Sequence, residues 1–258
     1  MRVRFWRPPR RLGHGEEATL IEHLEELRQR LFVCIGAVAV GWIVAFVVHD
    51  RVIHLLSDQL PPQHRQLLTL GIGEPFMTSV WLSLYLGFML ALPVVLWQAW
   101  AFFIPAVETE HERMLKAFVF LATVLMVTGV LFGYYVALPA AAKFLTNFDS
   151  SLYNVQIQAR PYITFATKVL IAMAIVFELP LFVIGLTRMG IVSTAKLRRN
   201  RRVGYFIVAC IGVALPGVDP VTTFFETIPL VVLYELSIWL SVLLDRRSAR
   251  ATAAAGIT

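Results

Sequence analysis

Two ionisable residues interrupt a long apolar run in the second half of the chain. Glu178 follows Lys168 by ten residues and stands two residues before Pro180. A charged side chain at the centre of the hydrocarbon layer costs about 3 kcal/mol on insertion scales, so this position needs a reason. Either the glutamate is hydrogen-bonded and holds helices together, or it offers a polar contact to something that enters the membrane. We favour the second interpretation and expect its carboxyl group to face a concave, protein-bounded surface.

The last apolar run raises the same question. Glu226 and Glu235 flank Pro229 there. Glu235 is close enough to the end of the run for its carboxyl group to reach the headgroup region.

Near the start of the chain, charged residues surround an apolar stripe. Four leucines recur at helical spacing and form this stripe: Leu20, Leu24, Leu27 and Leu31. The other faces are mostly charged: Glu22, Glu25, Glu26, Arg28 and Arg30. Thr19 with Glu22 forms a capping box, which predicts that the helix starts there. No charged residue follows until after Val48, so the pattern indicates a membrane span that is preceded by a charged, amphipathic helical segment.

Enzyme signatures are absent from the sequence. It contains no G-x-x-x-x-G-K-[ST], H-E-x-x-H, C-x-x-C or G-x-S-x-G. The six histidines all lie outside the apolar runs. We therefore expect no catalysis, no metal site and no cofactor.

The composition indicates a membrane protein with several spans. Hydrophobic residues make up 58% of the chain and charged residues 16%, against about 25% charged in a soluble domain. Apolar runs near the length that crosses a bilayer, about 20 helical residues, recur throughout. The fold class is therefore all-α, and six transmembrane helices are predicted: 31–48, 75–97, 115–138, 162–186, 203–215 and 221–244.

These spans form one domain, 19–245, between a basic arm, 1–18, and a disordered cytoplasmic tail, 246–258. The arm has no apolar core, so we expect a disordered segment near lipid headgroups and no cleavable signal peptide. We also predict that Pro93 kinks the second span and that Glu178 and Pro180 interrupt the fourth.

Basic residues are distributed unevenly between the two sides. Of the 23 Lys and Arg residues, 18 fall in the N-terminal 30 residues, the second-to-third loop, the segment 187–202 and the tail. Four fall in the alternate connections, and Lys168 lies within a span. The positive-inside rule then places both termini in the cytoplasm.

The fifth predicted span is unusually short. Its 13 residues, 203–215, rise about 20 Å against a hydrocarbon layer of about 30 Å. We expect Glu226 and Pro229 to shorten the lipid-facing part of the sixth span as well. Local thinning of the bilayer would follow.

Five motifs in order resemble the TatC family, the multispanning signal receptor of the twin-arginine protein export system. The first motif is His23-Leu-Glu-Glu-Leu-Arg-Gln-Arg-Leu31. The others are Trp100-Ala-Phe102 with Pro105, His111-Glu-Arg113, Phe177-Glu-Leu-Pro180 and the Pro216–Pro220 turn. Together they cover about residues 18–245.

The resemblance implies a function and a set of residues. TatC-like proteins bind signal peptides with two adjacent arginines on the cytoplasmic face of a bacterial or archaeal membrane. Carboxylates match the forked guanidinium, and Glu26 and Glu112 correspond to the family's signal-contacting glutamates. His23, Arg28, Phe102 and Arg113 belong to the same motifs. Without the resemblance, an i,i+4 pair with Arg30 would explain Glu26 and a solvated loop charge would explain Glu112.

The resemblance also implies partners. TatA-type and TatB-type single-span proteins would dock in an oligomeric complex, and nucleic acid would play no part. We assign this docking to Glu178, Asp219 and Thr223, within a glove-like bundle.

A proton-coupled secondary transporter is the alternative from another class, with Glu178 and Lys168 as its coupling pair. Such transporters usually show internal repeats and interrupted helices in both halves. The sequence shows no such symmetry, so we favour the receptor.

Overall fold

The computed structural model describes the backbone of residues 20–103, 109–188, 190–215, 217 and 219–254. Side chains are described for 24–99, 101–102, 118–188, 190–215, 217 and 219–245. Every regular element in these ranges is a helix. Five of its segments are long and apolar enough to cross a membrane: Leu24–Val47, Glu74–Ala99, Phe118–Asn147, Ala159–Arg188 and Pro220–Asp245.

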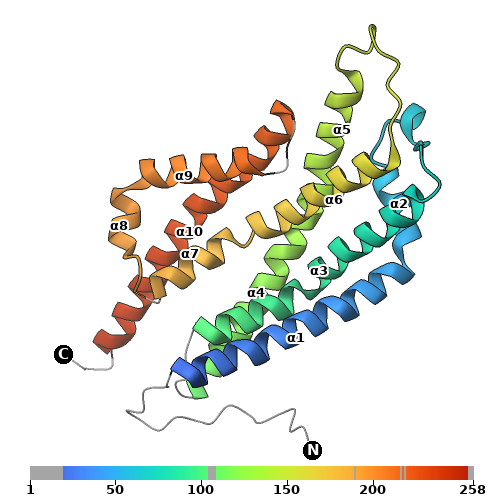
Figure 1. Ribbon diagram of the computed structural model, residues 1–258. Coiled ribbons are helices and arrows are strands. Elements are labelled where there is room, and N and C mark those ends of the chain that lie inside the picture. The colour runs from blue at the N-terminus through green and yellow to red at the C-terminus, as the bar shows by residue number, and fades with distance from the viewer. Residues whose placement is uncertain (1–19, 104–108, 189, 216, 218, 255–258) are drawn as a thin grey trace, which may run out of the picture.

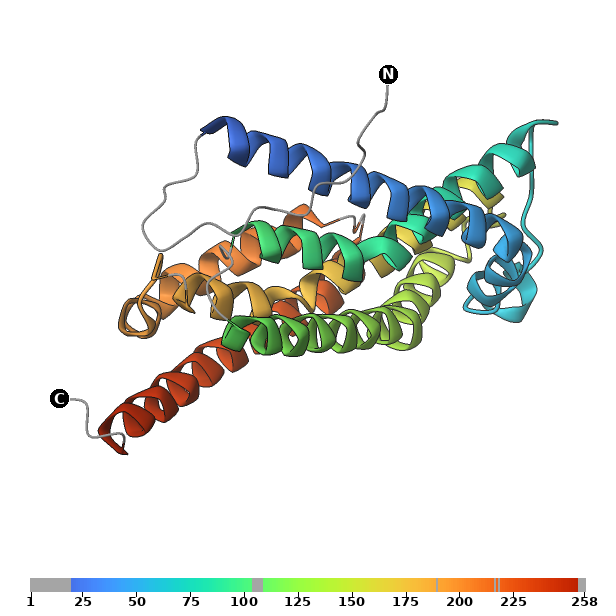
Figure 2. The same ribbon diagram turned by 90° about the horizontal axis from the view of Figure 1, so that it is seen from below.

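The helices form a bundle around one central helix. α1 (Leu20–Val47) packs along α3 (Glu74–Phe103), while α3 and α4 (Thr109–Phe132) both pack against α6 (Ala159–Val176). Figure 2 shows α1 on one side and α4 on the other, with α3 and α6 between them. At the far end of the sequence, α10 packs on α7 and α9 (Figure 1).

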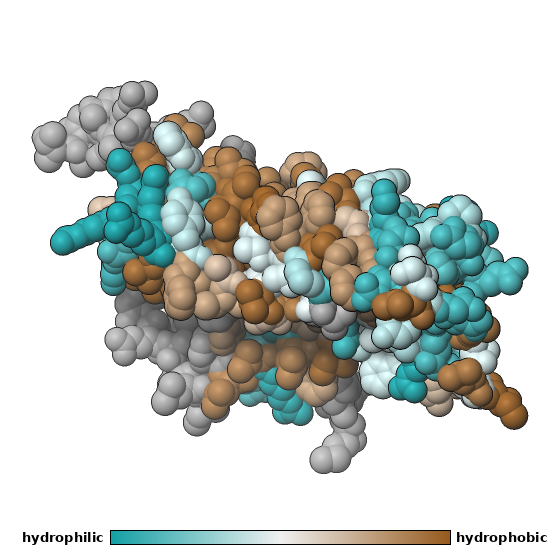
Figure 3. All heavy atoms as spheres, turned by 90° about the horizontal axis from the view of Figure 1, so that it is seen from above, coloured by the Kyte–Doolittle hydropathy of each residue, from teal (hydrophilic) through white to brown (hydrophobic). Residues whose placement is uncertain are grey.

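The surface has the polarity expected of a membrane protein. A broad apolar region separates hydrophilic ends in Figure 3. Large apolar side chains of α1, such as Phe32, Val40 and Ile43, are exposed. Only 11% of the α1 span is buried, against 61% of the span that contains α6. The outer surface of α1 therefore has no protein core to cover it and suits contact with lipid.

The core consists of two apolar clusters joined through α6. One gathers Leu82 of α3, Leu138, and Ile163 and Leu170 of α6. The other gathers side chains around the end of α6 and along α9 and α10: Met173, Val176, Phe177, Val208, Leu230, Leu233, Tyr234 and Ile238. α6 is buried because it contributes to both.

The two polar connections at one end of the bundle are tied together, and the first contains short helices. The first includes α2 (His49–Ser57) and η1 (Pro62–His64). Leu68 N donates to Ile157 O at 2.9 Å, and Ala159 N donates to Leu68 O at 2.8 Å. The Tyr162 hydroxyl donates to Leu56 O at 2.6 Å. These bonds fix the start of α6 against the first connection.

The third predicted span is too short at its C-terminal end. α4 continues through a π-helical turn, η2 (Gly133–Ala137), into α5 (Leu138–Asn147), so the apolar segment reaches Asn147. We had assigned residues from Pro139 onward to a connection. Pro139 is tolerated because it lies in the first turn of α5, after the π-helical turn has already changed the hydrogen-bond register.

The predicted interruption of the fourth span is confirmed. α6 ends at Val176 and α7 (Leu179–Arg188) begins after Glu178. Pro180 cannot donate to the carbonyl of Val176, which explains the break. By contrast, α3 runs through Pro93 as one continuous helix.

At the end of the chain, the helix predicted as the fifth span is short, as expected, but it is not one of the five segments long and apolar enough to cross a membrane, and the helix predicted as the sixth span is longer than expected. α9 (Arg201–Ala214) has 14 residues, preceded by the short α8 (Thr194–Arg199). α10 (Pro220–Ala254) has 35 residues, and its apolar segment is 26 residues long. The sixth span is therefore not short. Pro229 does not end the helix, and Glu226 is accommodated by complete burial.

Helices also take up both ends of the predicted loop 100–113. α3 extends to Phe103 and α4 starts at Thr109, which places Phe102 in a last turn and Glu112 in a first turn. The basic arm, 1–18, and the side chains of the tail, 246–258, lie outside the described residues.

Candidate functional site

Three side chains connect α1 and α3 near the ends of these helices. Arg30 Nε donates to Glu26 Oε1 at 2.9 Å, and Arg30 Nη2 donates to the same oxygen at 2.5 Å. Arg30 Nη1 donates to Gln98 Oε1 of α3 at 3.0 Å. The Arg30 and Glu26 side chains retain 20% and 36% of their exposure. One guanidinium therefore joins a carboxylate and an amide at a site that solvent still reaches.

The other residues implied by the TatC resemblance lie at the same end of the bundle. α1 and α4 begin there and α3 ends there, in both Figure 1 and Figure 2. The Arg28 guanidinium lies 5.6 Å from the centre of the Phe32 ring, and Phe102 is half-buried in the last turn of α3. His23, Glu112 and Arg113 lie in the first turns of α1 and α4, and their side chains fall outside the described residues.

Glu178 lies at the break between α6 and α7. Both of its carboxyl oxygens are enclosed by protein atoms, and neither has a hydrogen-bond partner among the described residues. The backbone at the break is satisfied, because Glu178 N donates to Ile175 O and Phe182 N donates to Glu178 O, each at 3.0 Å. The unmatched polar group is therefore the carboxyl group itself.

Lys168 does not pair with Glu178. Its side chain is exposed on α6, and no ion pair joins the two in the part of the chain that the structure describes. A coupling pair of the kind that the transporter hypothesis requires is not formed in this arrangement.

A polar cap begins α10. Asp219 is 6% exposed, and its carboxylate accepts a hydrogen bond from Thr222 N at 2.8 Å and another from the Thr222 hydroxyl. The Thr223 hydroxyl donates to the Asp219 carbonyl at 3.0 Å. The Asp219 side chain thus caps the start of a helix, and the Thr223 hydroxyl adds a bond to a carbonyl that already accepts from the Thr223 amide. We missed Thr222, although an Asp-x-x-Thr spacing before an apolar run is the signal of such a cap.

The other carboxyl groups of α10 differ in their surroundings. Glu226 is fully buried, and neither carboxyl oxygen has a hydrogen-bond partner among the described residues. Glu235 accepts a hydrogen bond from the Tyr205 hydroxyl and lies 3.5 Å from Arg201 Nη2. Glu235 therefore joins α9 to α10, and this side-chain pairing explains its place near the end of the span.

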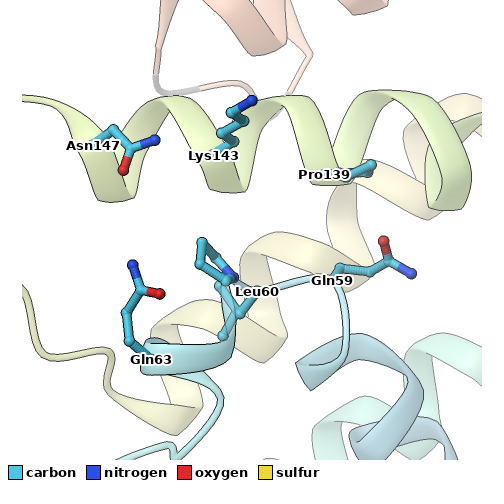
Figure 4. Close-up of a pocket in the computed structure, with 7 residues that line it drawn as sticks. Gln59, Leu60, Gln63, Pro139, Lys143 and Asn147 are labelled. Carbon is cyan, nitrogen blue, oxygen red and sulfur yellow. The ribbon is translucent and has the colours of Figure 1, made fainter.

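A cavity at the opposite end of the molecule lacks the features of an active site. It holds about 380 Å³ and lies between the first connection and α5. Lys143 lines it, but its ammonium group points away from Gln59 and Gln63 in Figure 4. Within the described residues, no group of three or more His, Cys, Asp or Glu side chains could hold a metal ion.

Comparisons with known proteins agree on one family. The model of the family described as Sec-independent protein translocase protein (TatC) matches residues 22–229. The TatC protein of Aquifex aeolicus is 34% identical over 233 residues, which cover 88% of this chain and 96% of that protein. The TatC protein of Carboxydothermus hydrogenoformans is 31% identical over 224 residues, covering 86% of this chain and 92% of that protein.

A solved structure supports the same assignment. The crystal structure of the twin-arginine translocase receptor TatC in DDM matches with a TM-score of 0.75 at 33% identity, covering 85% of this chain and 99% of that chain. The apolar helices indicate a multi-pass membrane protein of bacterial type with a role in protein transport. The chain belongs to the TatC family of Sec-independent protein translocase proteins.

Proposed function

We propose that this chain crosses the bacterial cytoplasmic membrane six times, with α9 as the fifth crossing and both termini in the cytoplasm. The distribution of Lys and Arg supports this orientation. In that frame, the start of α1, the end of α3 and the start of α4 face the cytoplasm.

The proposed function is to bind twin-arginine signal peptides at this cytoplasmic end. The observation that supports the proposal is the contact of Glu26 with a guanidinium, that of Arg30, because the carboxylate thereby pairs with the kind of group it would recognise while its side chain keeps 36% of its exposure. Glu112, in the first turn of α4, would take the second arginine. Helix N-termini favour anions within the first turn, so an acidic side chain is well placed at Glu112.

The proposed scaffold for TatA-type and TatB-type partners lies within the membrane. Glu178 has no hydrogen-bond partner among the described residues, so a donor on a docked helix would relieve the cost of burying it. Asp219 and Thr223 would contribute through the turn that starts α10. α9 rises only about 21 Å over its 14 residues, and the thinner bilayer beside it would ease the passage of folded cargo.

Pull-down from detergent extract with a twin-arginine peptide, beside a twin-lysine peptide, tests the receptor function. Replacing Glu26→Ala together with Glu112→Ala should abolish the difference between the peptides while the protein still inserts. Each charged hydrogen bond is worth about 1.5–3 kcal/mol, so each replacement should lower affinity at least about tenfold. Glu25→Ala is the matched control, because Glu25 is an exposed neighbour on the same helix. Undiminished selective capture by the double variant would contradict the proposal.

A further inference from the structure

The carboxylate of Glu26 is already occupied by a group of the kind it is proposed to recognise. Two nitrogens of Arg30 donate to it, and the third reaches Gln98. We propose that Arg30 is a built-in competitor, which holds the receptor carboxylate in the empty state and gives it up to a signal arginine. The inference rests on the proposed function.

The geometry suits exchange rather than a permanent pair. Arg30 and Glu26 are four residues apart on one helix, and such pairs at partly exposed positions shift an equilibrium by only about twofold. Both side chains keep contact with the surroundings, so an incoming guanidinium can approach. The bond that Arg30 makes is replaced by one of the same type, which keeps the barrier to exchange low.

Gln98 gives the displaced side chain a place to remain. It accepts from Arg30 Nη1, the nitrogen that does not contact Glu26. After exchange, Arg30 can keep this bond to α3 while the carboxylate turns to the ligand. Without such an acceptor, the loss of its bonds to Glu26 would cost Arg30 more free energy.

Competition of this kind sets a minimum binding free energy that a peptide must supply before it can displace Arg30 from Glu26. A peptide with one arginine exchanges one guanidinium for another and gains little. A peptide with two adjacent arginines displaces Arg30 and also makes a second contact. The favourable free energy of that second contact is then added to an exchange that is itself nearly neutral. Lysine is a point charge without the planar fork, and it replaces Arg30 less well. Arg30 thus raises the intrinsic affinity that a signal peptide needs before it can occupy Glu26.

Binding of labelled peptides to the detergent-purified full chain tests the inference. The peptides carry Arg-Arg, Arg-Lys or Lys-Lys at the signal position. Arg30→Gln should bind the Arg-Arg peptide about twofold more tightly, and it should raise Arg-Lys binding by about the same factor. Arg199→Gln removes the same charge from an exposed side chain of α8. It therefore measures how much peptide affinity rises when one repelling positive charge is removed away from Glu26. Arg30→Lys keeps the charge but loses the fork, and a smaller increase is expected.

A double-mutant cycle separates this inference from the proposed function. In a Glu26→Gln background, Arg30→Gln should add no more than Arg199→Gln adds, since the competitor then has nothing to block. Weaker Arg-Arg binding by Arg30→Gln would mean that Arg30 positions Glu26, and no change would mean that it has no role; either overturns the inference. If Glu26→Gln itself leaves Arg-Arg binding intact, the proposed function fails instead.

Discussion

Replacing Gly41 by alanine should drive α1 away from α3. An added Cβ atom at Gly41 would stand 2.5 Å from the carbonyl oxygen of Gly87. A close carbon–oxygen contact needs about 3.3 Å, so the helices must separate by roughly 1 Å. The obstacle is backbone on both sides, because a Cβ atom at Gly87 would stand 2.4 Å from Trp42 N. No rotamer change can relieve it.

The consequence reaches the candidate binding site. If the separation extends along both helices, the 3.0 Å bond from Arg30 to Gln98 lengthens to about 4 Å, beyond hydrogen-bond distance. Overpacking of this kind costs about 1–3 kcal/mol. For a protein of this size, each kcal/mol lowers the melting temperature by about 2–4 °C.

Thermal unfolding of the detergent-purified protein measures the effect. Gly36→Ala is the control, because an added Cβ atom there meets nothing within 4 Å while the gain in helix propensity is the same. Gly41→Ala should melt about 2–12 °C below Gly36→Ala and should lose part of its discrimination between twin-arginine and twin-lysine peptides. Equal melting temperatures for the two variants would refute the reasoning.

Three further outcomes are expected. Glu178→Gln should keep much of the export of a twin-arginine reporter, because the amide can still pair with a docked helix. Glu178→Leu should lose this export. Equal export by the two variants would count against docking at Glu178. Asp219→Ala should cost about 1 kcal/mol through loss of the cap on Thr222, and Asp219→Asn less; thermal unfolding decides, and identical melting of the two would exclude a capping role. Four apolar residues inserted after Val208 should block export but spare signal-peptide binding, and normal export by the lengthened α9 would reject a role for its shortness.

The sequence predicts best where covalent chemistry constrains the backbone. The break at Glu178 follows from the missing amide of Pro180, and α1 starts at Leu20, where the capping box of the sequence predicts a helix start. The shortness of α9, 14 residues, is predicted by the basic segment before it and the Pro216–Pro220 turn after it. Proline alone does not mark the end of a helix, since α3 and α10 run through Pro93 and Pro229, and the kink at Pro93 stays a prediction.

Features that depend on contacts between distant residues were not predictable in this way. The continuation of α4 into α5 depends on a π-helical turn whose residues, Gly133–Ala137, carry no pattern distinct from an α-helix. The i,i+4 pair of Glu26 and Arg30 was foreseeable, but the bond to Gln98, 68 residues away, was not. Complete burial of Glu226 likewise depends on the helices that pack against α10 and cannot be read from the sequence of α10 itself.

Polar groups that cost stability are concentrated at one junction of the bundle. Phe177 and Leu230 belong to the same apolar cluster; Glu178 follows the first in sequence, and Glu226 precedes the second by one helical turn. Both glutamates bury carboxyl oxygens without hydrogen-bond partners among the described residues, at a cost of some kcal/mol each. α1 shows the opposite arrangement, with its charged residues at one end and an apolar surface along the rest. The proposed recognition at the end of α1 requires no loss of stability. The proposed docking within the membrane requires an unmatched polar group, and the junction of α6, α7 and α10 holds two such groups.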